Sequence, residues 1–170
     1  MTEHADSALQ TLIDKDAVSQ VVLQYARAVD AHDWPLYAAC FTPTFYRDFS
    51  SFAPNVRGEA TNVGFAEEVS RTLTGFDATQ HNSTNHHHEI NGDTATCRSY
   101  MTAEHIFIED GVSDSITLGG GYTNQLIRTS VGWKINHCTI HIRWSRGNMA
   151  LFEKAIQRAA ERNLHWTAPA

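Results

Sequence analysis

Apolar residues recur at helical spacing between residues 15 and 34 and predict an amphipathic helix. Asp14 is the expected N-cap, and neither proline nor glycine interrupts the pattern before Pro35. Tyr25 and Asp30 flank the apolar stripe, so both side chains can face whatever the stripe covers. A carboxylate at the margin of an apolar face needs a partner, unless Asp30 points to water or caps the next segment.

The remaining pattern changes from helical to alternating along the chain. We expect a short helix over Asp33–Cys40, a strand within Phe41–Phe52 and a helix over Glu59–Leu73. Alternation then predicts four long strands and a terminal amphipathic helix, over Asp77–Asn91, Thr94–Ile108, Ile116–Thr129, Trp133–Trp144 and Asn148–Arg162. Helices followed by a meander of antiparallel strands indicate an α+β fold, with helices on one face of a curved sheet.

Alternation also assigns faces to two of the strands. Between residues 94 and 108 the odd positions are mostly apolar, which places His105 on the inward face. The strand over residues 77–91 is polar on both sides. Such a strand lines a wet pocket when it lies inside a sheet, but an exposed edge strand has the same pattern.

Composition and charge narrow the class of protein. The chain has 170 residues and a formal net charge of −6, which fits a single domain over residues 11–165 after a flexible N-terminus over 1–10. The acidic balance argues against nucleic acid, and no apolar run is long enough to span a membrane. Three distant cysteines and the lack of a signal-peptide pattern predict reduced thiols and a cytoplasmic location.

Four segments in order resemble one known family. They are YARAVDAHDW, FDATQHNSTN, GDTATCRSYMTAEH and GGGYTNQLIRTSVGWKI. Over about residues 10–150 the chain is similar to the SnoaL-like branch of the NTF2-like superfamily, which includes scytalone dehydratase and bile acid 7α-dehydratase. The resemblance implies an NTF2-like cone, in which N-terminal helices pack on a strongly curved mixed, mainly antiparallel sheet around one deep pocket.

The resemblance also suggests catalytic residues. Asp30 and His81 match the Asp–His pair of these lyases, Tyr25 matches a tyrosine of the bile acid enzymes, and His105 resembles a second pocket histidine of the scytalone dehydratases. The related dehydrochlorinases carry a lysine at the position of Tyr25, so dehalogenation is not carried over.

An Asp30–His81 pair has a definite chemistry. The carboxylate fixes the imidazole tautomer, so the other ring nitrogen can act as a general base, with Tyr25 as oxyanion donor and His105 as secondary acid. We expect a lyase that dehydrates a hydrophobic cyclic or polycyclic substrate with no metal or organic cofactor. An isomerase or cyclase using the same pocket, or a non-catalytic ligand-binding or assembly subunit, remains an alternative.

Several further polar residues are candidates for substrate binding, namely Tyr46, Tyr122, Asn124, Arg143 and Trp144. Arg143 and Trp144 would close the pocket mouth, or else cap the barrel or pack under the C-terminal helix. His105 could equally be a buried imidazole bonded to a backbone carbonyl.

Three other features concern metals, curvature and assembly. In the run Asn85–His88, His87 faces opposite to its two histidine neighbours, and we favour partly exposed strand residues over a metal site. Gly119–Gly121 lies inside a strand and indicates sharp curvature or a closely packed helix. The apolar stripe of the last helix predicts a subunit contact, and we expect a homo-oligomer, either a trimer, as the resemblance favours, or a dimer.

Overall fold

The computed structural model describes residues 2–169, and side chains from residue 7 onward. Four helices and six strands follow one another as α1 (Thr2–Asp30), α2 (Trp34–Ala38), β1 (Phe41–Asp48), β2 (Arg57–Thr61), α3 (Asn62–Leu73), β3 (Ala78–Asn91), β4 (Thr94–Glu109), β5 (Val112–Thr129), β6 (Gly132–Gly147) and α4 (Leu151–Glu161). Within that range, no helix has the length and apolar character to cross a bilayer.

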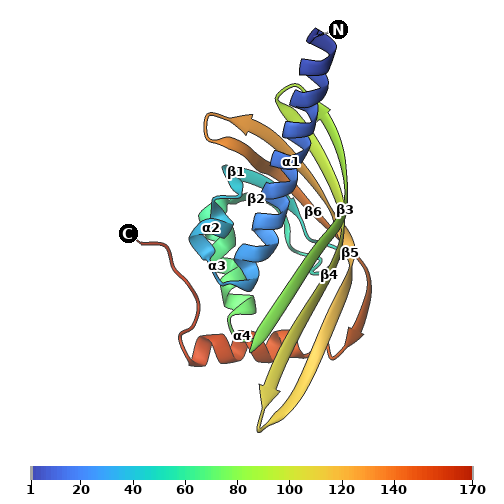
Figure 1. Ribbon diagram of the computed structural model, residues 1–170. Helices are drawn as coiled ribbons and strands as arrows, with labels where there is room; N and C mark the ends of the chain where they lie inside the picture. The colour runs from blue at the N-terminus through green and yellow to red at the C-terminus, as the bar shows by residue number, and fades with distance from the viewer. Residues whose placement is uncertain (1, 170) are drawn as a thin grey trace.

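The strands form one mixed sheet in the order β2-β1-β6-β5-β4-β3. Strand β1 pairs with β6 in parallel, and the other neighbouring pairs are antiparallel. Helix α1 runs along the concave side of this curved sheet, α2 and α3 lie beside it, and α4 crosses one end (Figure 1). The α+β architecture expected from the order of elements is confirmed.

Helix α1 buries the stripe that its sequence predicts. Val18, Val22 and Val29 are almost fully buried against the sheet. The expected N-cap was wrong, because the helix begins at Thr2 and includes residues for which we expected a flexible terminus. Asp14 instead lies in the middle of the helix. Its buried carboxylate forms an ion pair with Arg128 on β5, with 2.8 Å between Asp14 Oδ2 and Arg128 Nη2.

The region after β1 differs from the expectation. The helix predicted from residue 59 begins at Asn62, where the Thr61 hydroxyl accepts a hydrogen bond from the backbone N–H of Gly64. Residues 57–61 form β2, which pairs with the end of β1. The short helix α2 agrees with its prediction, and Asp33 caps it by accepting from the N–H of Leu36.

The faces predicted for β4 are confirmed. Its odd positions are buried, and His105 is only 2% exposed. Strand β3 is the edge of the sheet, so its polar outer side chains face solvent. The inner ones lie under α1, and they include His81, His86 and His88.

Close backbone approach explains the three consecutive glycines of β5. The pairing with β6 shifts register between Gly119 and Gly120. A Cβ atom would lie 1.9 Å from the indole of Trp144 at Gly119, and 1.8 Å from the carbonyl oxygen of His141 at Gly120. The glycines therefore let β6 and the Trp144 indole lie close to β5 at a bulge. Of the two alternatives we gave for these glycines, this agrees with sheet curvature and not with a closely packed helix.

Helix α4 packs on its own chain. Leu151, Phe152, Ala155 and Ala159 are buried, whereas Ile156 is 45% exposed. Arg158 fixes the helix to the sheet end, because its guanidinium donates to the carbonyls of Gly75 and Ile108 and to the Asp77 carboxylate. Most of the stripe that we assigned to a subunit contact is thus covered within the fold.

Candidate active site

Asp30 and His81 form a tightly bonded pair between α1 and β3. The Asp30 Oδ1 atom lies 2.7 Å from the His81 Nδ1 atom. The second carboxylate oxygen accepts from the backbone N–H of His81 at 2.7 Å, and the Thr79 hydroxyl donates to Oδ1 at 2.9 Å. Asp30 therefore points to the sheet, and the alternative in which it faces water is wrong.

The end of α1 and the alternation of side chains on β3 together position this pair. Asp30 is the last residue of α1, beyond the valine stripe that seats the helix on the sheet. Thr79 and His81 are two apart on β3, so both side chains point to the same inward face. The Asp30 carboxylate thus contacts the side chains of Thr79 and His81 and the backbone N–H of His81.

The electrostatics of the pair favour an ionised carboxylate and one imidazole tautomer. Burial alone would raise the pKa of Asp30, but hydrogen bonds from the side chain and backbone of His81 outweigh it, and they lower the pKa below its ordinary value. An ionised carboxylate only accepts hydrogen bonds, so His81 carries its proton on Nδ1. The Nε2 atom then keeps a lone pair, and the His81 side chain is 11% exposed.

The His81 ring lines a cavity of about 270 Å³ on the concave side of the sheet. Its wall is mainly apolar and aromatic, with rings contributed by helices, strands and the loop between β1 and β2, among them Phe49, Phe52, Phe65 and Phe152. Glu68 and Ile156 also line the cavity and are well exposed, so they mark its mouth between α3 and α4.

Three tyrosines line the same cavity as His81. The Tyr25 hydroxyl donates to the hydroxyl of Tyr122 at 3.4 Å, and Tyr37 packs against the Tyr25 ring. Burial holds the pKa of Tyr25 and of Tyr122 above the ordinary value, so both phenols are neutral donors. The Tyr37 hydroxyl is buried without a hydrogen-bond partner among residues 2–169, which makes it a ready partner for a bound oxygen atom.

His105 lines the cavity but cannot serve readily as an acid. Its Nδ1 atom lies 3.2 Å from the carbonyl oxygen of Ile116, to which it donates. Burial, and next repulsion from the protonated form of His81, lower the pKa of His105 from 6.5 to about 4. The imidazole is therefore neutral at neutral pH, with a lone pair on Nε2. The alternative of a buried imidazole bonded to a backbone carbonyl is the one observed.

Four of the five predicted substrate-binding residues lie away from the cavity wall. Tyr122 lines it, but Tyr46 packs on His137 and accepts from Arg57. Arg143 lies over the exposed ring of Tyr100, and the Trp144 indole covers Gly119. Asn124 is buried further along the sheet, opposite Cys97. These four assignments are corrected for position: Tyr46 follows the inward-facing Phe45 and so faces outward, and a bulge in β6 displaces Arg143 and Trp144.

The sequence analysis missed part of the cavity wall. Tyr37 is fully buried, and helical spacing from Trp34 could have indicated it. Phe49 and Phe52 come from an irregular loop, where no periodic pattern indicates which way a side chain faces.

The fold and the paired site define a class of protein: an NTF2-like cone in which the imidazole of an Asp–His pair lines a cavity on the concave side of the sheet. The sequence profile of the SnoaL-like domain matches residues 10–139. The chain belongs to the SnoaL-like family, as its four sequence segments indicated. No curated protein sequence matches the chain significantly.

Solved structures of similar proteins share the fold. The Kfla4162 protein from Kribbella flavida is 23% identical, with a TM-score of 0.75 over 80% of this chain and 95% of its own. A scytalone dehydratase-like protein from Novosphingobium aromaticivorans is 18% identical, with a TM-score of 0.71 over 87% and 92%. Hexachlorocyclohexane dehydrochlorinase LinA-type3 from Novosphingobium barchaimii is 14% identical, with a TM-score of 0.69 over 95% and 99%.

Proposed function

We propose that this protein is a cofactor-independent lyase that removes water from a small hydrophobic cyclic hydroxy-ketone. One observation carries the proposal: a general base, His81 held by Asp30, stands on the wall of an apolar cavity. The cavity volume lies just below the roughly 300–1,000 Å³ of ligand pockets in general, which favours one or two rings over a large polycyclic skeleton.

The reaction follows from the protonation states of the site. The His81 Nε2 atom takes the proton on the carbon next to the substrate carbonyl, and the electrons of the broken C–H bond form an enolate. Asp30 stabilises the resulting imidazolium. When the enolate collapses, the β-hydroxyl leaves, takes the proton back from His81 and departs as water. Substrate minus water gives the enone, and His81 returns to its starting state.

Tyr122 is well suited to stabilise the enolate oxygen. Tyr25 donates to the Tyr122 hydroxyl, so the proton of Tyr122 is free to point into the cavity. Tyr25 then acts through Tyr122 as a positioning residue, and we revise its assignment as the direct oxyanion donor accordingly. A preorganised phenol in an apolar site stabilises a developing oxyanion more than water would.

His105 has a different role from the acid that we expected. With Nδ1 bonded to the Ile116 carbonyl, the Nε2 lone pair can accept a hydrogen bond from a substrate hydroxyl. We therefore assign His105 to substrate orientation, and His81 to both proton transfers.

A scytalone dehydratase-like protein and a hexachlorocyclohexane dehydrochlorinase have this fold at 18% and 14% identity, so the fold is compatible with an elimination. An isomerase would use the same base and return the proton to another carbon. A non-catalytic subunit would have a pocket filled by its own side chains, whereas this one holds an open cavity.

The decisive experiment incubates the full chain with a panel of cyclic β-hydroxy-ketones in D₂O. Enone absorbance reports water loss, and NMR reports deuterium next to the carbonyl. We expect turnover with at least one ring system, and its abolition in His81→Ala with a thermal midpoint near that of the parent. Parent-level turnover in His81→Ala would refute the base assignment.

A matched control is available on the same strand. His87 faces away from the helix on the exposed side of β3, and His87→Ala should keep full activity. Double-bond migration without loss of water would identify the isomerase alternative. A panel that neither reacts nor exchanges deuterium would contradict the proposal.

A further inference from the structure

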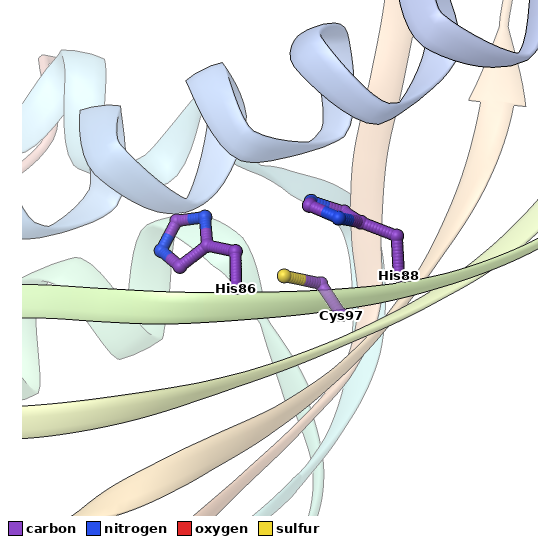
Figure 2. A group of neighbouring side chains, drawn as sticks. All are labelled: His86, His88 and Cys97. Atoms are coloured by element: carbon purple, nitrogen blue, oxygen red, sulfur yellow. The ribbon is translucent and has the colours of Figure 1, made fainter.

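A second cluster of reactive side chains lies beneath α1, beyond the dyad along β3. His86 and His88 on β3 and Cys97 on β4 each offer a ligand atom, and these atoms lie within 4.8 Å of one another. Figure 2 shows both imidazoles reaching from β3 toward α1, with the Cys97 sulfur between them. Nothing in the dehydration chemistry uses these three residues.

A bulge in β3 brings the two histidines together on the inward face. Thr79, His81 and Ser83 face inward at odd positions, and the pairing with β4 shifts between Thr84 and His87. Asn85 takes a φ of 55° at this bulge, a conformation that asparagine tolerates better than most residues. After it, His86 and His88 face inward and His87 faces out.

Hydrogen bonds already hold both imidazoles in place. The Ser19 hydroxyl of α1 lies 2.9 Å from His86 Nδ1 and 2.8 Å from His88 Nε2, so it spans the gap between the two rings. The opposite nitrogen of His86 lies 3.0 Å from the Ser83 hydroxyl. A hydrogen bond to the far nitrogen is how proteins fix the orientation of metal-binding imidazoles.

A buried acceptor next to the cluster has no partner. Asn124 is directly opposite Cys97 in the pairing of β4 with β5, on the same inward face. It is 2% exposed, and its Oδ1 atom has no hydrogen-bond partner in the described part of the chain. An unsatisfied buried acceptor is costly, and a metal-bound water would supply a donor on this side of the cluster.

We propose that His86, His88 and Cys97 bind a zinc ion that ties β3 and β4 together beneath α1. Imidazole nitrogen and thiolate sulfur are both ligands of zinc, and a water would complete the tetrahedron here. Zinc–ligand bonds of about 2.0–2.3 Å place ligand atoms about 3.3–3.8 Å apart, so the ligand atoms need to approach one another by at most about 1–1.5 Å.

Zinc binding releases one proton. Burial raises the pKa of the Cys97 thiol to about 11, so zinc displaces the S–H proton to solvent as the Zn–S bond forms. The Ser19 hydroxyl vacates the gap between the imidazoles. Sequence spacing did not reveal this site, because its third ligand comes from the neighbouring strand.

The test uses the full chain stripped with a chelator and then dialysed against Zn²⁺. We expect one zinc per chain, a higher thermal midpoint, and affinity weakened roughly tenfold or more in Cys97→Ser and in His88→Gln. With Co²⁺ as a probe, the parent should show a thiolate-to-cobalt charge-transfer band that Cys97→Ser lacks.

Two matched variants control for adventitious binding. His87→Gln removes the outward histidine of the same run, and Cys138→Ser removes another buried thiol; both should bind zinc as the parent does. The proposal is overturned if the parent retains no zinc or lacks the cobalt band. It is also overturned if folded Cys97→Ser and His88→Gln, checked by circular dichroism, bind zinc as tightly as the parent.

Discussion

Replacing Asp30 by asparagine should invert the protonation of His81. One carboxylate oxygen accepts from the backbone N–H of His81, which is a donor that cannot change. The amide of Asp30→Asn must therefore turn its oxygen to that N–H and its NH₂ to His81 Nδ1. The ring then accepts at Nδ1 and carries its proton on Nε2, where the proposed base needs a lone pair.

The magnitudes separate the effect on catalysis from the effect on stability. A wrong tautomer in a comparable carboxylate–imidazole pair lowers the rate by about 10⁴-fold, equivalent to about 5.5 kcal/mol of transition-state stabilisation. The folded protein loses only charge assistance, because the amide oxygen keeps the backbone bond and Thr79 can rotate its hydroxyl to accept. We expect that loss to be about 1 kcal/mol in the free energy of unfolding.

The tautomer can be measured without a substrate. Long-range ¹⁵N–¹H correlation spectra of protein labelled at histidine distinguish a protonated Nδ1 from a protonated Nε2. The spectrum of His81→Gln assigns the relevant signals among the ten histidines. The parent should show protonated Nδ1, and Asp30→Asn should show protonated Nε2.

Thr79→Val is the matched control, because it removes one hydrogen bond to Asp30 and leaves the carboxylate in place. It should keep the parent tautomer and lose no more than about 100-fold in rate, since a hydrogen bond to a charged group contributes about 1.5–3 kcal/mol. Protonated Nδ1 in Asp30→Asn, or a fall in rate no larger than that of Thr79→Val, would refute the reasoning.

Two further predictions concern stability. The pKa of His105 is lowered to about 4 in the folded protein, against 6.5 in the unfolded chain, so the unfolded state binds a proton first as pH falls. The free energy of unfolding should therefore drop by roughly 3 kcal/mol between pH 7 and pH 4 relative to His105→Gln, measured by urea titration, and parallel profiles would contradict this. Gly75→Ala would place a Cβ atom 1.9 Å from the Ala155 carbonyl oxygen. The resulting shift of α4 should lower the free energy of unfolding by about 1–3 kcal/mol, measured by thermal unfolding. An unchanged midpoint would show that α4 can move without loss of stability.

Local periodicity explains the parts of the fold that the sequence predicts well. The valine stripe of α1 and the alternation of β4 are each read from one element, and both place their residues on the observed face. The same patterns fail where burial is weak. The first turns of α1 expose Leu9 and Leu12 and show no stripe, and β2 is a short edge strand of mostly polar residues.

The candidate site required more than periodicity. Spacing identified Asp30 as a carboxylate in need of a partner, but it did not select His81; the family resemblance did. Their contact depends on how α1 lies across β3, which is a long-range property of the whole sheet. Tyr46 and Tyr37 show the same limit, because the face of a residue after a turn depends on a register that tertiary packing sets.

The bulge at Asn85 links the two sites on β3. Perfect alternation from His81 would turn Asn85, His87 and Glu89 toward α1 and leave His86 and His88 in solvent. One extra residue reverses that assignment for the second half of the strand and leaves the dyad in the first half unaffected. An edge strand tolerates such an insertion because only one side of it is paired. The strand that holds the proposed base can thus present the proposed zinc ligands, beginning two residues beyond Thr84.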